Sequence, residues 1–515
     1  MKEGNPGSFF IVFLLMFCGL YAVVSVILTE GNSIGQMCQF LMVAGFLVSL
    51  ITPRMGFFAW MVFCGYNDLL KRLLVVGGRV SHNDLMWVLG ITPAMFAGVV
   101  VSLAMGGLFG SRRIQGREWI LLVVGVLLML GAGALAASQE GGSLNAVLQG
   151  IANNGLYTLL LFVVPVLLKN KRDVAAVWRC LVITYLPVAI YGVVQQINGF
   201  TDFEVEYLRT GLSIEIKQLF AGEVRAFSTL NSPTSLSIVC AALAVLSLIL
   251  GFSRRDPGSP VRMSRTLSVI CFAIYITGLI ASTSRSAFLM LPIGLIGAKC
   301  FAMPGRTRVF YSVVISGFLL LIASSGWLIN NLQQVNDMAL SLGGPGVFIS
   351  RMLVVGTYWD RLSGFSTVLT NPKAWSFFGY GKAEDGTGMY YYHDPISAII
   401  MQYGVIVLIL VFVILVLMLR WFHRQAWGME SNEDRRFASA LIAVGFSILM
   451  VSILSGSVMA VFPVNIFFWL ACAGVLGLSK KPEPSEVTES APVQRSFPQG
   501  GRFAPNQGRL HQQVR

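Results

Sequence analysis

The stretch "GMYYYHDPISAIIMQYGVIVLILVFVILVLML", residues 388–419, joins a polar, aromatic segment to an apolar run long enough to cross a lipid bilayer. Similar apolar runs recur along the 515-residue chain, of which 55% is hydrophobic and 12% is charged. A soluble protein of this length carries about twice that charged fraction. Because a backbone in lipid must satisfy its own hydrogen bonds, these uniformly apolar runs predict helices rather than the alternating strands of a β-barrel.

We predict an all-α, polytopic membrane protein of about 12–14 transmembrane helices, with a large external loop domain between the penultimate group of helices. The first apolar run, Phe9 to Leu28, is long for a signal-peptide core and lacks a small-residue cleavage site, so we interpret it as a retained helix. The third span is short and is a candidate re-entrant segment. The fourteen candidate spans begin near Phe9, Ile34, Met55, Met86, Trp119, Ala146, Val177, Thr234, Thr266, Ala287, Val309, Ile396, Phe437 and Phe462.

The charges divide between the two sides of the membrane when the N-terminus is placed inside. The predicted internal segments hold 26 Lys and Arg against 10 Asp and Glu, and the external ones hold 11 against 14, which together make the 37 and 24 of the whole chain. The positive-inside rule therefore favours cytoplasmic N- and C-termini, provided that the third span is real. One external segment, "NDLLKRLLVVGGRVSH" (67–82), departs from the rule. We interpret it as an interfacial helix, and contact of Lys71 and Arg72 with lipid phosphates is the alternative.

Two external segments are long enough to suggest a function of their own. The first runs from about residue 198 to 233, and the second, 330–395, is a candidate lid over a substrate. We therefore expect N-terminal transmembrane helices in residues 1–221 and a core that includes the lid in residues 222–479. The tail, 480–515, is rich in Pro, Ser, Gln and Gly, which predicts a disordered cytoplasmic segment.

The residue types argue against several other classes of site. The eight cysteines lie in or beside apolar runs and form no CxxC pattern, which is typical of buried structural thiols. The external loops contain no Asp-x-Asp pair or histidine cluster, so we expect neither a metal nor another cofactor. The net charge of +13 follows the membrane topology and does not indicate a nucleic-acid partner.

Two arginines at the predicted external ends of helices are candidates for anion binding. Arg285 follows Ser282, Thr283 and Ser284 in a short external hairpin, and hydroxyl groups beside a guanidinium suit a phosphate. The alternative is an arginine that reaches the membrane interface. Arg225 precedes a helix predicted to begin near Pro233, where a helix N-terminus beside an arginine can bind an anion. Ordinary capping by Ser228, Thr229, Asn231 and Ser232, beside a solvated arginine, is the alternative there.

His393 precedes the twelfth predicted span and is a candidate general base or positioning group. The adjacent Asp394 can fix the tautomer of this histidine or remain solvated. The three tyrosines before it, which end at Tyr392, suit either an interfacial aromatic belt or a sugar-stacking surface. A lone structural histidine is the alternative reading of this position.

Four short motifs resemble the O-antigen ligase and polymerase family, which includes exopolysaccharide polymerases. The family's ligases carry His-[Asn/Ser/Gln]-x9-Gly-x-x-[Gly/Thr/Tyr]; here His393, Asp394, nine residues and Gly404 follow this spacing, with Val407 at the last position. The histidine, spacing and glycine match, whereas the aspartate and the valine depart from the ligase pattern. "STSRSAFLMLPIGLIGA" (282–298), "VRAFSTLNSPTSLS" (224–237) and "YWDRLSGFSTVLTNPKAWSFFGYG" (358–381) resemble the family's Ser-Arg, Arg…Asn-Pro and Trp…Asn-Pro…Gly-x-Gly elements.

This resemblance implies a metal-independent membrane glycosyltransferase in a bacterial inner membrane, with its active site on the periplasmic face. The donor would be an oligosaccharide linked to polyprenyl diphosphate, and the acceptor a glycan or a lipid-linked glycan. Arg225 and Arg285 would hold the donor diphosphate, and His393 would act on or position the acceptor hydroxyl. We assign substrate binding to five further residues, Ser284, Arg351, Arg361, Tyr392 and Asp394. Membrane lipids, a flippase and chain-length or export proteins are the expected partners.

Polymerisation of a surface or secreted polysaccharide is the first hypothesis, because the aspartate and valine depart from the ligase motif. Ligation of glycan to the lipid A core is the enzymatic alternative. A flippase or transporter for lipid-linked oligosaccharide is the alternative from another class, and an assembly scaffold is a third. A flippase needs a charged path through the membrane and often has related halves, whereas here the polar segments gather on one face and no repeat is evident.

Overall fold

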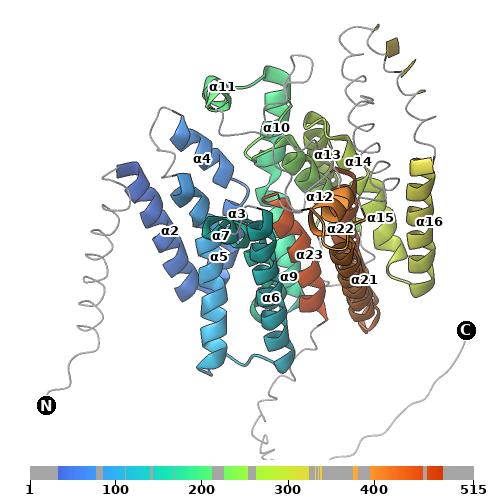
Figure 1. Cartoon of the computed structure of the whole chain (residues 1–515), viewed down its shortest axis with the longest axis horizontal. Coiled ribbons are helices and arrows are strands. Elements are labelled where there is room, and N and C mark those ends of the chain that lie inside the picture. The colour runs from blue at the N-terminus through green and yellow to red at the C-terminus, as the bar shows by residue number, and fades with distance from the viewer. Residues whose placement is uncertain are drawn as a thin grey trace, which may run out of the picture. The chain divides into compact units, whose positions relative to one another are not determined.

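The computed structural model describes residues 33–76, 85–110, 112–139, 143–168, 170–210, 225–252, 263–323, 331, 334–335, 337–338, 341, 375–380, 395–455 and 461–479. All of them lie in the first of the two units of the chain, Met1–Lys480, and the second unit, Lys481–Arg515, lies outside them. The described residues form helices joined by turns, with no strand among them, which confirms the predicted all-α class (Figure 1). The first predicted span, most of the lid (330–395) and the tail (480–515) fall outside the described residues.

Eight helical spans of the described chain are long and apolar enough to cross a membrane, as expected for a multi-pass protein. Two shorter apolar helices, α13 (Arg265–Ala281) and α23 (Val464–Leu478), lie among them. The eight spans are formed by α2 (Ser33–Ile51), α5 (Leu85–Leu108), α6 (Gly116–Gln139), α7 to α8 (Leu144–Leu167), α9 to α10 (Lys171–Asn198), α12 (Pro233–Phe252), α21 (Val405–Trp427) and α22 (Asn432–Ser455).

The third predicted span is a pair of short helices, α3 (Pro53–Phe63) and α4 (Asn67–Val75). That the chain crosses back through this pair of helices follows from the directions of α2 and α5, which lie side by side (Figure 1). Gly90 faces Met42 and Gly98 faces Phe46, so residue numbers rise together along the two helices and the helices are parallel. Two parallel neighbours need a return pass between them, and α3 and α4 are that pass. These three passes therefore agree with the predicted topology of the second, third and fourth spans.

Residues of the predicted internal loops contact one another at one end of the bundle. Arg54 pairs with Asp173, and Lys171 pairs with Asp434 at 3.2 Å. Arg117, at the start of α6, donates hydrogen bonds to Gln425 and to Ser479, near the ends of α21 and α23. Predicted internal segments that are far apart in the sequence therefore meet at one end of the bundle. The predicted topology requires this arrangement.

The hairpin of α12 and α13 fixes the opposite end of the bundle. Met263 donates to the carbonyl of Leu250 at 3.1 Å, and Gly278 faces Cys240, so the two helices run antiparallel. The start of α12 and the end of α13 consequently lie at the same end. The short helix α14 (Arg285–Phe288), which precedes α15 (Met290–Cys300) and α16 (Pro304–Ala323), packs against α12 there. We call this end of the bundle the site end.

The apolar core is continuous from α3 to α23 and is filled by large side chains such as Trp60, Tyr157 and Trp178. The outer helices present apolar side chains away from it. In α21, for example, Phe412 is 66% exposed and Leu417 is 59% exposed. Such surfaces suit contact with lipid tails, which are as apolar as the side chains themselves.

The twelfth predicted span is corrected in one respect. The run that begins at Ile396 is not one helix, because α20 (Pro395–Tyr403) ends before Gly404 and α21 starts after it. Gly404 has a φ of 88°, a left-handed backbone conformation that favours glycine, and this conformation turns the chain between the two helices. His393 therefore precedes a nine-residue helix rather than the spanning helix itself.

Candidate functional site

The segment that carries Arg225 runs along the site end and leads into α12. Arg225 is half-buried, whereas Ala226 and Phe227 after it are fully buried. The hydroxyl oxygen of Ser232 accepts a hydrogen bond from the backbone N–H of Ser235 at 3.2 Å, and Pro233 is the first residue of the helix. Of the four residues named as candidate caps, Ser232 therefore caps this helix. We call residues 225–232 the Arg225 loop.

Ser228 gives the Arg225 loop a strained conformation. Its φ is 57°, and only one other non-glycine residue of the described chain has a left-handed φ. All of its polar groups are held: the N–H donates to Gln195 Oε1 at 2.6 Å, the hydroxyl donates to the carbonyl of Val188, and the carbonyl accepts from Arg72. Strain of this kind persists where the surroundings determine the conformation and is frequent at functional sites.

Arg72 clamps the Arg225 loop from α4 and is only 1% exposed. Its guanidinium donates to the carbonyl oxygens of Ser228 at 2.6 Å and Leu230 at 3.2 Å. It also lies 4.6 Å from the centre of the Phe227 ring. The alternative in which Arg72 contacts lipid phosphates is therefore wrong, because its charge is held inside the bundle. This explains why the segment departs from the positive-inside rule.

Two carboxylates and a lysine complete the electrostatics around Arg72. Glu204 lies 3.6 Å from the Arg72 guanidinium, and Lys71 pairs with Asp68 at 3.1 Å. Both ion pairs are largely buried, with side-chain exposures of 1% and 0% for Arg72 and Glu204 and of 16% and 6% for Lys71 and Asp68.

Glu204 is the centre of a hydrogen-bond network that joins α10 (Leu186–Asn198) to α11 (Asp202–Arg209). Its Oε2 accepts from the N–H of Thr201 at 3.0 Å and from the hydroxyl of Thr201 at 2.9 Å. The first of these bonds and the bond from the Glu204 N–H to the Thr201 side chain form a capping box. Its Oε1 accepts from the Tyr191 hydroxyl at 2.9 Å and from the Gln195 amide. Gln195 in turn accepts from the N–H groups of Phe227 and Ser228. The network therefore links the Arg225 loop to α10, α11 and, through Arg72, to α4.

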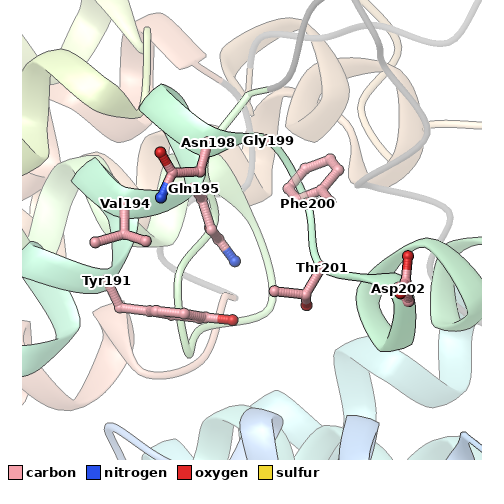
Figure 2. A pocket seen from close by; sticks show the side chains of 8 residues that line it. All are labelled: Tyr191, Val194, Gln195, Asn198, Gly199, Phe200, Thr201 and Asp202. Carbon is pink, nitrogen blue, oxygen red and sulfur yellow. The ribbon is translucent and has the colours of Figure 1, made fainter.

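A pocket of about 330 Å³ opens beside this network, between the end of α10 and the start of α11 (Figure 2). In Figure 2 the Gln195 side chain points into the space between Tyr191 and Phe200. The other walls include Val194, Asn198 and Asp202. The Phe200 ring also packs on the Phe227 ring of the Arg225 loop, with 4.9 Å between their centres. The pocket and the loop therefore share one wall.

Residues 282–285, which we call the Arg285 motif, lie at the same end of the α12–α13 hairpin as the Arg225 loop. Ser282, Thr283 and Ser284 are all buried, and Arg285, the first residue of α14, is half-buried. Thr283 is the second non-glycine residue of the described chain with a left-handed φ, at 52°. Each of the two arginine motifs thus contains one strained residue.

A part of the predicted lid, residues 375–380, docks on the turn between α20 and α21. Tyr380 donates from its N–H to the carbonyl of Met401 at 2.7 Å, and Val405 donates to the carbonyl of Ser376 at 3.0 Å. A methyl group added at Gly404 would lie 2.2 Å from the carbonyl oxygen of Phe377. Gly379, with a φ of 68°, faces Gly404 in the same contact. Two glycines of the resemblance motifs therefore meet.

Five of the predicted site residues cannot be located, because they fall outside the described residues. They are His393, Asp394, Tyr392, Arg351 and Arg361. Arg225, Arg285 and Ser284 are described and lie at the site end. Within the described part of the chain, no group of three or more His, Cys, Asp or Glu residues is close enough to hold a metal ion.

Sequence reasoning missed Gln195, Glu204 and the role of Arg72. The Thr201-x-x-Glu204 spacing is a capping-box pattern that could have drawn attention to Glu204. For Arg72, the signal was that its segment, 67–82, carries positive charge on the predicted external side, against the positive-inside rule.

A second buried polar contact was also missed. The Asn465 amide donates to the carbonyl of Asn153, in the π-helix Ile151–Gly155. Such π-helical turns are frequent at functional sites, and the signal in the sequence was a pair of asparagines within an apolar span.

The fold and the buried polar site end define an all-α, multi-pass membrane protein. No protein-family model matches the chain, and no curated protein matches it either.

Proposed function

We propose that the chain is an inner-membrane glycosyltransferase that takes glycan from a polyprenyl-diphosphate carrier on the periplasmic face and polymerises a surface or secreted polysaccharide. The observation that carries this proposal is the shared location of the two arginine motifs. The Arg225 loop and the Arg285 motif lie at one end of the α12–α13 hairpin, and each holds one of the two left-handed non-glycine residues of the described chain. Two guanidinium groups at one end suit a diphosphate.

In the proposed reaction the acceptor hydroxyl oxygen attacks the anomeric carbon of the donor glycan. The bond between that carbon and the diphosphate oxygen breaks, and the proton of the hydroxyl passes to the neutral imidazole of His393. Negative charge grows on the departing polyprenyl diphosphate, and Arg225 and Arg285 stabilise it. Preorganised cations of this kind are each worth about 10²- to 10³-fold in rate.

The contact between Gly379 and Gly404 ties part of the lid to the turn that ends α20, the helix that follows His393 in the sequence. The Arg225 loop is also held firmly, because Arg72 and Gln195 both bind its backbone. A rigid support of this kind is what catalytic groups require.

Two other functions remain as outcomes of the test. A ligase would use the same residues to transfer a finished glycan to a lipid acceptor. A flippase would move the lipid-linked glycan without breaking a glycosidic bond, so loss of one arginine would change transport rather than chain length.

The test is the surface polysaccharide of a deletion strain that carries wild type, Arg225→Ala, Arg285→Ala or His393→Ala at matched expression. Arg209→Ala is the matched control, because Arg209 is an exposed arginine on α11, near the same end. The polymerase proposal predicts that the three site variants lose long-chain glycan and accumulate single lipid-linked repeat units outside, while the control does not. Accumulation of polymerised, unattached glycan would indicate a ligase. Wild-type behaviour of all three variants would overturn the proposal.

A further inference from the structure

We propose that the pocket between α10 and α11 binds neutral sugar residues of the glycan substrate. This inference rests on the proposed function and assigns the glycan-binding part of that site. The pocket volume of about 330 Å³ lies at the lower end of the range for small-ligand sites, about 300–1,000 Å³.

The chemistry of the walls suits a sugar. Tyr191 and Phe200 supply aromatic surface, and the apolar C–H face of a sugar ring packs on such rings. Asn198 and Asp202 line the same space with an amide and a carboxylate, which donate to and accept from hydroxyl groups. Neither side chain makes a hydrogen bond or ion pair with the described part of the chain, so both are open to a ligand.

The inner polar groups of the pocket are already held in place. The Tyr191 hydroxyl and the Gln195 amide both donate to Glu204, and the Thr201 hydroxyl donates to the other carboxylate oxygen. Glu204 is fully buried and faces Arg72. The floor of the pocket is therefore preorganised, and a ligand would not need to order it on binding.

The charge of the walls argues for a sugar rather than for the diphosphate of the carrier. The only charged residue that lines the pocket in the described chain is Asp202, and no lysine or arginine lines it. A carboxylate repels a diphosphate, whereas it binds sugar hydroxyls well. Four cations of the site lie outside the pocket: Lys71 beside Asp68, Arg72 beneath the Arg225 loop, and Arg225 and Arg285 in their own motifs.

The pocket is joined directly to the loop that would hold the diphosphate. Gln195 binds the N–H groups of Phe227 and Ser228 from one side and lines the pocket from the other. The Phe200 ring contacts the Phe227 ring two residues from Arg225. A glycan whose sugars lie in this pocket would therefore lie beside the proposed reaction centre.

The test is saturation-transfer difference NMR on the purified full-length chain in lipid nanodiscs. The probe is a set of short oligosaccharides cut from the host's own surface polysaccharide by partial acid hydrolysis. The decisive variant is Val194→Trp, which fills the pocket. Its control is Ile197→Trp on the same helix, because Ile197 is 76% exposed and does not line the pocket. Asn198→Ala removes one amide partner and leaves the volume otherwise intact.

The proposal predicts sugar signals with wild type and Ile197→Trp and their loss with Val194→Trp. Asn198→Ala should weaken binding about 2- to 10-fold, the value of one lost hydrogen bond. Absence of signals with wild type, or equal signals with Val194→Trp, would overturn the inference. If Arg285→Ala loses glycan transfer but the wild type binds no oligosaccharide, the proposed function stands and this inference is refuted. Specific binding in the pocket with normal transfer in Arg225→Ala and Arg285→Ala would refute the proposed function alone.

Discussion

Arg72 illustrates how a single residue can organise a site that it does not enter. Its guanidinium reaches two carbonyl oxygens of the Arg225 loop and faces the buried carboxylate of Glu204. Ser228, held between Arg72 and Gln195, adopts a backbone conformation that serine rarely has. At the scale of residues, Arg72 and Gln195, which fix the Arg225 loop, therefore shape the site end as much as the two arginines that we propose bind substrate.

Replacing Arg72 by alanine should destabilise the protein by about 3–5 kcal/mol, because Glu204 would be left as an unpaired buried charge. Arg72→Lys should restore part of this loss, since a lysine keeps the charge but cannot match the fork of hydrogen bonds. The free energy of unfolding, measured by titration with a denaturing detergent, checks both variants. Arg209→Ala, on the exposed side of α11, is the control and should change stability by less than about 0.5 kcal/mol. A near-neutral Arg72→Ala would contradict the clamp.

Thr283→Gly should make the protein more stable by about 1 kcal/mol, because glycine adopts a φ of 52° without steric cost. If the strain serves the site, the same variant should lose transfer activity despite its higher stability. Thr277→Gly, in the interior of α13, is the control and should lower stability by a few tenths of a kcal/mol. If Thr283→Gly lowered the stability as Thr277→Gly is expected to do, the backbone at Thr283 would not be strained.

At the scale of elements, the break at Gly404 is the feature with the widest consequences. It divides the predicted twelfth span into α20 and α21, and it provides the surface on which residues 375–380 dock. The two glycines in contact there, Gly379 and Gly404, both have left-handed φ values. One turn therefore positions part of the lid and the helix that follows His393.

Gly404→Ala should destabilise the protein by about 1–3 kcal/mol, because alanine is strained at a φ of 88° and its methyl group would meet the carbonyl of Phe377. Gly131→Ala in α6 is the matched control, since a methyl group there would meet no neighbour within 4 Å. The control should be neutral or slightly stabilising, as alanine favours helices. Unfolding titrations of the two variants side by side give the comparison, and equal stabilities would disprove the tight contact.

The sequence was sufficient for the elements and insufficient for their contacts. Apolar runs identify helices because lipid leaves the backbone no alternative, and so the helix starts near Ile34, Met86 and Thr234 could be predicted. The cap at Ser232 could be predicted as well, since it depends on local sequence. The clamp by Arg72 joins positions 156 residues apart, and no local pattern encodes such a pairing. The residues of the lid that precede α20, including His393, stay predictions.

At the scale of the whole molecule, the topology joins the separate observations. Parallel α2 and α5 require the return pass of α3 and α4, and the antiparallel α12 and α13 bring both arginine motifs to one end. The ion pair between Lys171 and Asp434 belongs to the opposite end. Apolar flanks and one end that holds both arginine motifs suit the reaction that we propose on one face of the membrane.

With the site end on the periplasmic face of an inner membrane, as we propose, this topology predicts that a membrane-impermeant maleimide labels Arg209→Cys in cells whose outer membrane has been permeabilised. Arg113→Cys, between α5 and α6, should be labelled only after the inner membrane is opened. Both changes are made in a variant without native cysteines, so that each labelled band reports one position. Labelling of Arg113→Cys before Arg209→Cys would reverse the proposed orientation.

The measurement that tests the central claim most directly is glycan transfer by the purified chain in nanodiscs. Polyprenyl-diphosphate-linked repeat units extracted from the deletion strain serve as donor and acceptor, and chain length is read on a gel. The account predicts that wild type and Arg209→Ala lengthen the glycan, while Arg225→Ala and Arg285→Ala do so about 10²- to 10³-fold more slowly. Equal rates for Arg285→Ala and wild type, or no lengthening by wild type at all, would contradict it.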